Sequence, residues 1–177
     1  AALVAADGTE YSTMVTAVCG NGVEFGIKIA SLPGQWFTAP APMMKGRYTS
    51  SEFTEKDQRP WMGDSCVVEC YGMGGFAAAA SPIVCNLRGM TLKESIGQTK
   101  EMYRITMEKN YNFPIPNLDF DFLPVGIDIR KVLKEGVCPA IHGGMFNRVG
   151  GLIGAGMARV PMQCFEKALV AFGEKYL

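Results

Sequence analysis

The stretch GDSCVVECYGMGGFAAAASP, residues 63–82, decides the fold and carries the densest functional signal. Residues 64–71 are rich in valine and cysteine, which favours a short strand. The glycines that follow permit positive φ angles or close backbone approach, and the alanines after Phe76 favour a helix. The stretch therefore predicts a strand that carries Asp64 and Glu69 and turns sharply into a helix.

The glycine cluster in this stretch has two interpretations. Free backbone amides at the beginning of a helix attract phosphate or carboxylate groups, so the N–H groups of Gly72, Gly74 and Gly75 could bind an anion. Alternatively, the glycines only let a strand turn tightly into a packed helix. The order Gly-Met-Gly-Gly-Phe matches neither the phosphate-binding pattern that ends in Lys-Ser/Thr nor the dinucleotide pattern GxGxxG.

Composition limits the class of protein. The chain has 177 residues, of which 48% are apolar and 19% charged, so we expect a single domain over residues 1–177. Seventeen basic residues balance seventeen acidic ones and are scattered, which argues against nucleic acid as a partner. No apolar run approaches the roughly 20 residues of a membrane span. These features predict a soluble, cytoplasmic protein without a membrane partner.

The chain opens on Ala-Ala-Leu-Val-Ala-Ala, which is typical of the last turns of a helix that ends at Asp7-Gly8. A basic leader is absent from this opening. We therefore expect the chain to be the C-terminal part of a longer polypeptide.

Six cysteines, without a Cys-x-x-Cys pair, indicate reduced and mostly buried thiols. Cys66 and Cys70 would share one face of the predicted strand, which suits a core face as well as a ligand pair. A single histidine, His142, is too few for a typical zinc site, so we expect no metal and no cofactor. A third possibility is a thiol enzyme that uses Cys66 or Cys70, which would require a nearby general base.

The first third of the chain, before the central stretch, contains simple local signals of secondary structure. Residues 11–19 are rich in β-branched side chains, and residues 23–30 alternate between apolar and polar side chains. With Asn21-Gly22 between them, they predict a β-hairpin. Residues 32–60 contain four prolines and the pair Trp36-Phe37. They predict a long irregular loop, which is uncommon unless it covers a site or an interface.

The second half of the chain predicts mainly helices and short strands. Thr91 and Glu94 form the pattern of a capping box, and apolar residues at helical spacing predict a helix over residues 91–110. Strict alternation over residues 118–123 predicts a strand with Asp119 and Asp121 on one face. These two carboxylates either face solvent or bind a metal or share a proton.

The last third completes the predicted topology. Residues 127–134 form a short helix that ends at Gly136, and Pro161 begins a final amphipathic helix that continues to about residue 176. Strands over residues 137–141 and 152–160 are expected to flank a loop over residues 142–151. The fold class is therefore α/β or α+β, with a mixed sheet, packed helices and glycine-rich loops.

Four strings occur in the order typical of one family: NGVEFGIKIASLPGQWFTAPAP, GDSCVVECYGMGGFAAAASP, PVGIDIRKVLKEGVCPAI and GLIGAGMARVPMQCFEKAL. The chain resembles a bacterial family of formerly unknown function that includes a large subunit of oxamate carbamoyltransferase, an enzyme of anaerobic allantoin degradation and purine catabolism. The resemblance covers nearly the whole chain. It implies a multi-subunit complex whose other subunits include a chain similar to the α subunit of succinyl-CoA synthetase.

The resemblance implies phosphorolysis of oxalurate, or of a related ureido or acyl compound, to carbamoyl phosphate. Such a site needs donors for phosphate, donors for a developing oxyanion and a cation for a carboxylate. Backbone amides of the glycine cluster could bind the anion, Arg148 the carboxylate and Asn21 the ureido group, while Asp64 or Glu69 orients the amide nitrogen. The candidate catalytic residues are Asp64, Glu69 and His142, and the candidate binding residues are Asn21, Gly72, Gly74, Gly75 and Arg148.

Two departures from the family pattern affect the substrate. After residues 139–141 the family usually has Asn-Thr-Gly, whereas this chain has His142-Gly-Gly, and Cys70 replaces a usual threonine. A substrate other than oxalurate is therefore possible, and His142 itself is either a general base or a structural histidine. The alternative function is a non-catalytic assembly subunit of a complex related to acyl-CoA synthetases, with the Trp36 loop and the glycine-rich loops in contact with partner chains.

Overall fold

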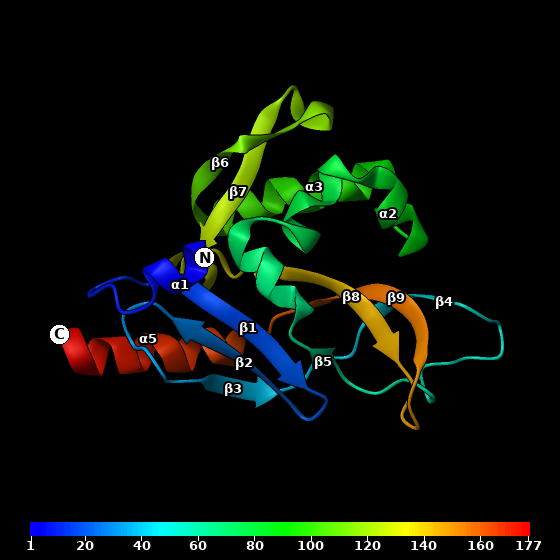
Figure 1. Cartoon of the computed structure of the whole chain (residues 1–177), viewed down its shortest axis with the longest axis horizontal. Helices are drawn as coiled ribbons and strands as arrows, with labels where there is room; N and C mark the ends of the chain where they lie inside the picture. Colours follow the sequence, from blue (N-terminus) through cyan, green and yellow to red (C-terminus); the bar gives the residue numbers. More distant parts are fainter.

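A computed structural model describes all 177 residues. Figure 1 shows helices packed around strand pairs that are all antiparallel. The predicted α+β class is confirmed. The strands divide into three separate sheets, of four, three and two strands, where the sequence predicted one mixed sheet.

The first sheet is built on the predicted hairpin. Its strands, in spatial order, are β3 (Phe37–Pro40), β2 (Glu24–Ile29), β1 (Val15–Asn21) and β5 (Met62–Gly63). The side-chain oxygen of Asn21 accepts the backbone N–H groups of Val23 and Glu24, which closes the turn between β1 and β2. The final helix α5 (Met162–Tyr176), predicted from its amphipathic pattern, covers β2 and β3.

The second sheet lies beside the first and has the order β4 (Lys45–Tyr48), β9 (Leu152–Arg159), β8 (Ala140–Phe146). Trp61 is buried between the two sheets: a Cβ at Gly20 of β1 would lie 2.8 Å from its ring, and one at Gly143 of β8 would lie 2.7 Å from it. The indole therefore needs a glycine on each side. The predicted loop over residues 142–151 is wrong in its first half, because His142 to Phe146 belong to β8.

Residues 32–60 are not one irregular loop, because they contain both β3 and β4. Each of these strands has only four residues and pairs with a longer strand, β2 or β9, that the local pattern does not reveal as its neighbour. Phe37 is buried, whereas 47% of Trp36 is exposed.

The third sheet is the pair β6 (Thr106–Ile115) and β7 (Asp121–Ile127), which extends from the body of the molecule (Figure 1). A short 3-10 helix, η4 (Pro116–Leu118), leads into Asp119 and Phe120, both with positive φ. The predicted strand over residues 118–123 is therefore wrong in its first half and confirmed in its second: Asp119 lies in the turn, while Asp121 begins β7 and pairs with Lys109 at 2.7 Å. The two carboxylates do not share a strand face.

The central stretch of residues 63–82 differs most from its prediction. Residues 65–71 form the 3-10 helix η1 (Ser65–Tyr71) instead of a strand, and the alanines form a second 3-10 helix, η2 (Gly74–Ala80), before the short helix α2 (Pro82–Leu87). Burial explains the difference, because Cys66, Glu69 and Cys70 are buried at helical spacing. Tertiary packing overrides the strand propensity of the two valines.

The remaining helices follow their local signals. Thr91 caps α3 (Leu92–Met102) with the predicted capping box, although the helix ends at Met102 and a 3-10 turn, η3 (Tyr103–Ile105), leads into β6. Gly136 ends α4 (Ile129–Glu135), and the opening alanines form α1 (Ala2–Ala6). None of the helices combines the length and the apolar character that a membrane crossing requires.

Candidate functional site

Glu69 is the only carboxylate with no exposed surface, and it joins three elements. From η1, its Oε1 accepts the backbone N–H of Gly75 in η2 at 3.0 Å and that of His142 in β8 at 2.8 Å. A Cβ at Gly74 would lie 2.2 Å from Oε1, and a Cβ at Gly75 would lie 2.2 Å from the carbonyl oxygen of Ala140. The glycine pair therefore lets η2 pack directly over the carboxylate and onto β8.

Burial changes the protonation of this carboxyl group. It raises the pKa of Glu69 from 4.5 to about 7, although the N–H groups of His142 and Gly75 oppose the shift. Glu69 is therefore divided between its charged and neutral forms at neutral pH. A buried carboxyl with a pKa near the working pH is a feature of functional sites.

Gln98 of α3 fixes the state of His142. The Gln98 Nε2 donates to the carbonyl oxygen of Gly75 at 2.6 Å, which identifies it as the amide nitrogen, and it also lies 3.0 Å from His142 Nε2. Because Nε2 of Gln98 can only donate, His142 Nε2 must accept. The imidazole is then neutral and carries its proton on Nδ1.

The surroundings of His142 keep it neutral. Burial lowers the pKa of His142 from 6.5 to about 4, and the positive charges of Arg88 and Arg159 lower it further. No protein acceptor faces its Nδ1–H, and 7% of the residue is exposed. The ring therefore offers one N–H donor at the edge of the cluster formed by Glu69, Gly75, Gln98 and His142, here called the Glu69 cluster.

Two acceptor atoms in the Glu69 cluster have no partner: Glu69 Oε2 and Gln98 Oε1, both fully buried. An unpaired buried acceptor costs free energy, so both atoms call for an explanation. When Glu69 is protonated, its carboxyl group has a donor of its own. The cluster thus combines a carboxyl group whose pKa is about 7 with a neutral histidine.

The structure brings together only some of the residues that the sequence singled out. Glu69, Gly74, Gly75 and His142 meet in one place. The backbone N–H of Gly75 is occupied by Glu69, so binding of a substrate anion there stays a prediction and requires Glu69 to release it. The carboxylate that the glycine cluster holds in this structure belongs to the protein itself.

The other predicted site residues lie apart from the Glu69 cluster. Asp64 is exposed before η1, and the side-chain oxygen of Asn21 is used in the hairpin turn. The N–H of Gly72 donates to the carbonyl oxygen of Glu69, where it ends η1. Arg148 follows the far end of β8 and donates to the carbonyl oxygen of Gln58 at 3.0 Å.

Sequence reasoning missed Gln98 and Arg88. Gln98 is 5% exposed on an otherwise ordinary amphipathic helix, and only its burial beside His142 distinguishes it. Arg88 follows α2, and its charge lowers the pKa of both Glu69 and His142. In the sequence Arg88 is one of many scattered cations, so no local signal could have identified it.

The cysteines do not form a catalytic or metal site. All six are free thiols, and burial raises the pKa of Cys66 and Cys70, which keeps both protonated. The Cys66 thiol donates to the carbonyl oxygen of Val18 at 3.4 Å. A thiolate nucleophile is therefore disfavoured. No three His, Cys, Asp or Glu side chains gather within reach of one metal ion.

Comparisons with known proteins find similarity to one family and to several longer proteins. The sequence model of the family described as oxamate carbamoyltransferase subunit AllG matches residues 1–65. Over 165 residues the chain is 38% identical to the oxamate carbamoyltransferase subunit AllG of Escherichia coli K12, covering 92% of this chain and 39% of that protein. The chain is thus similar to the AllG family, by the family model over residues 1–65 and by the E. coli protein over most of this chain.

Two further relatives are similar along nearly the whole chain. The uncharacterized protein YahG of Escherichia coli K12 is 42% identical over 178 residues, or 99% of this chain and 38% of YahG. The crystal structure of a conserved protein of unknown function from Enterococcus faecalis V583 superposes with a TM-score of 0.94 at 43% identity, covering 98% of this chain and 42% of that one. The chain thus spans well under half the length of each relative.

Proposed function

We propose that this chain contributes to a multi-subunit carbamoyltransferase that cleaves oxalurate, or a related ureido compound, with phosphate. The similarity to a protein named as an oxamate carbamoyltransferase subunit supports this proposal. The observation that carries it is the neutral His142, whose Nε2 accepts from Gln98 and whose backbone N–H donates to Glu69, so that its Nδ1–H is left without a protein partner.

The reaction defines what the site must do. A phosphate oxygen attacks the ureido carbonyl carbon, and negative charge develops on the carbonyl oxygen. The bond from that carbon to the nitrogen of oxamate then breaks, and this nitrogen takes up a proton. A neutral histidine N–H is a suitable donor to the developing oxyanion, because it stabilises charge without first giving up a proton.

Glu69 has a different part in this proposal. Its side chain is fully buried, and its Oε1 bonds to the backbone of His142, so it acts as a positioning residue for the imidazole. Gln98 completes the arrangement because it holds the proton of His142 on Nδ1. Asp64, Asn21 and Arg148 lie outside the Glu69 cluster and have no part in this proposal.

The test is phosphate-dependent formation of carbamoyl phosphate from oxalurate by the full native complex. His142→Ala removes the donor, and we expect kcat to fall about 100-fold or more. His142→Asn keeps an N–H near the position of Nδ1 and should retain part of that activity. Glu52→Gln serves as a control, because it neutralises an exposed carboxylate that has no assigned role. Equal activity of wild-type and His142→Ala complexes, with assembly intact by size exclusion, would place the chemistry in another subunit.

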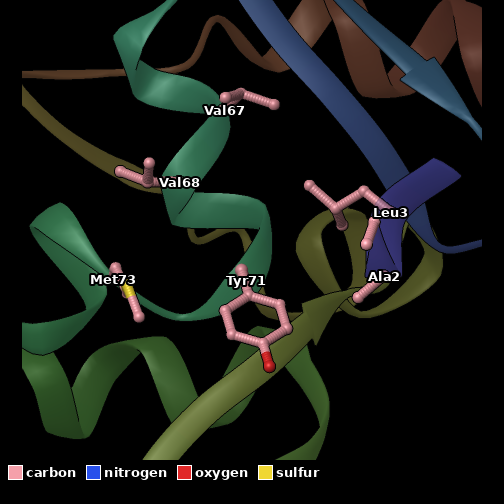
Figure 2. A pocket seen from close by; sticks show the side chains of 7 residues that line it. Ala2, Leu3, Val67, Val68, Tyr71 and Met73 are labelled. Carbon is pink, nitrogen blue, oxygen red and sulfur yellow. The ribbon is translucent and has the colours of Figure 1, made fainter.

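One observation favours a second candidate function, that of a non-catalytic assembly subunit. A cavity of about 430 Å³ opens at the surface between the N-terminal residues and η1, and only apolar residues line it (Figure 2): Ala1, Ala2, Leu3, Val67, Val68, Tyr71 and Met73. We assign its occupant as an apolar side chain of a partner subunit. Val68→Asp should then dissociate the complex while leaving this chain folded, whereas a catalytic role predicts lost turnover in an intact complex for His142→Ala.

A further inference from the structure

One face of the second sheet carries an unusual set of cations next to the Glu69 cluster. Cα partners across the sheet place Lys45, Met157 and His142 in one row, and Arg47, Ala155 and Gly144 in the row two residues further on. Because side chains alternate between the faces of a strand, both rows project from the same face. Lys45 and Arg47 are exposed, and Ala155 separates Arg47 from Gly144, over which the side chain of Leu152 lies.

The chain around Arg88 packs against this face of the second sheet. It follows α2, and the next residue, Gly89, lies against Arg47: a Cβ at Gly89 would be 3.5 Å from Arg47 Cγ and 3.6 Å from its Nε. The Nη1 of Arg88 donates to the carbonyl oxygen of Val84 at 3.2 Å, while its Nε is buried and has no acceptor. This guanidinium N–H is therefore free to donate to an oxygen atom of a ligand.

The charges on this face do not balance. None of Lys45, Arg47 and Arg88 belongs to any of the five ion pairs of the chain, whereas the neighbouring Arg159 is paired with Glu101. Glu69 lies within electrostatic reach of Arg88, but it is fully buried and forms no ion pair with it. Lys45, Arg47 and Arg88 therefore form no ion pair within the chain.

We propose that Arg47 and Arg88, together with Lys45, form an oxyanion-binding site on the open face of β4, β9 and β8, beside the Nδ1–H of His142. Guanidinium groups bind carboxylate and phosphate through paired, charge-assisted hydrogen bonds, so the ligand is a carboxylate or phosphate group. This assignment rests on the proposed function for its link to His142. It replaces Arg148 as the cation that the reaction requires.

The experiment is a titration of the purified full chain with inorganic phosphate and, separately, with oxamate, followed by calorimetry and by amide NMR shifts. We expect Arg88→Ala and Arg47→Ala each to weaken binding of the preferred probe about tenfold or more. Arg88→Lys keeps the positive charge but not the planar guanidinium group that makes paired hydrogen bonds. It should therefore weaken binding less than Arg88→Ala does. Lys134→Ala is the control, because it removes an exposed cation on α4, outside this sheet, and should leave the affinity unchanged.

The two probes distinguish the two parts of the reaction: preference for phosphate assigns the surface to the attacking group, and preference for oxamate assigns it to the carboxylate of the substrate. The inference is overturned if the wild-type chain binds neither probe at millimolar concentration, or if Arg47→Ala and Arg88→Ala bind as tightly as Lys134→Ala. Lost phosphate binding in Arg88→Ala, combined with unchanged turnover in His142→Ala, would retain the anion site and reject the proposed function. Unchanged phosphate binding in Arg88→Ala, combined with lost turnover in His142→Ala, would reject the anion site alone. Thermal unfolding of each variant verifies that it is folded.

Discussion

The carboxylate of Glu69 accepts the backbone N–H of His142 at 2.8 Å, although 73 positions separate the two residues in the chain. The same Oε1 accepts the N–H of Gly75, so one oxygen fixes β8 and η2 to η1. Such a bond is charge-assisted only while Glu69 is ionised. The stability of this junction and the orientation of His142 are therefore linked to a single titrating group.

Removal of the Glu69 carboxyl group should lower the free energy of unfolding more than its replacement by a neutral amide. Glu69→Ala leaves two buried N–H groups without an acceptor, and we expect the free energy of unfolding to fall by about 2 to 5 kcal/mol. Glu69→Gln keeps an acceptor oxygen for both N–H groups and should cost clearly less. Urea unfolding of the two variants measures the difference, and equal losses would show that Oε1 does not hold the junction.

The stability of the protein should depend on pH through Glu69. The folded-state pKa of about 7 lies above the ordinary value of 4.5, so the contribution of this group is fully present below pH 4.5 and is lost as the pH rises through about 7. From the size of this pKa shift, the free energy of unfolding should fall by about 3 kcal/mol over that pH range. His142 has the opposite effect, because its stabilising contribution is lost as the pH falls from 6.5 through about 4.

The Glu69→Gln variant separates these two effects. Without a titrating carboxyl group, the difference in unfolding free energy between wild type and variant should change steadily between pH 4.5 and pH 7 and then level off. Urea unfolding across this range gives that difference directly. A constant difference would mean that the pKa of Glu69 is the same in the folded and unfolded chains.

The glycine pair should tolerate no side chain. Gly74 has φ 59° and its Cβ position lies 2.2 Å from Glu69 Oε1, so Gly74→Ala combines backbone strain with a clash against a buried carboxyl group. We expect it to reduce the unfolding free energy by about 2 to 4 kcal/mol. Gly97→Ala is the matched control, because Gly97 lies in α3 with nothing within 4 Å of its Cβ position. This control should stabilise the protein by up to about 1 kcal/mol.

Local signals in the sequence predicted the elements whose ends are set locally. The capping box of Thr91 and the left-handed Gly136 mark helix ends with groups close in the chain, and both are confirmed. The region of η1 was misread because its valines favour a strand, while the contacts that make it a 3-10 helix come from β1 and β8. Helix α3 ends early because residues after Met102 pair with β7.

The candidate site could be predicted only in part for the same reason. Glu69 stands out in the sequence as an acid within an apolar run, and His142 is the only histidine. Gln98 becomes important only because α3 places it 3.0 Å from the imidazole of His142. Arg47 and Arg88 are ordinary surface cations until β4 and the end of α2 come together in the fold.

The protonation of His142 provides the most direct test of the Glu69 cluster. Nitrogen NMR of the wild-type chain should show a neutral imidazole with its proton on Nδ1 at neutral pH, and protonation only near pH 4. Gln98→Met removes the donor to Nε2 at similar volume, so the proton should then divide between the two ring nitrogens. Gln163→Met, an exposed substitution on α5, should leave the ring signals unchanged. A proton on Nε2 in the wild-type chain would contradict the arrangement, because Gln98 could not then donate to it and Nδ1 would lose its role as the free donor.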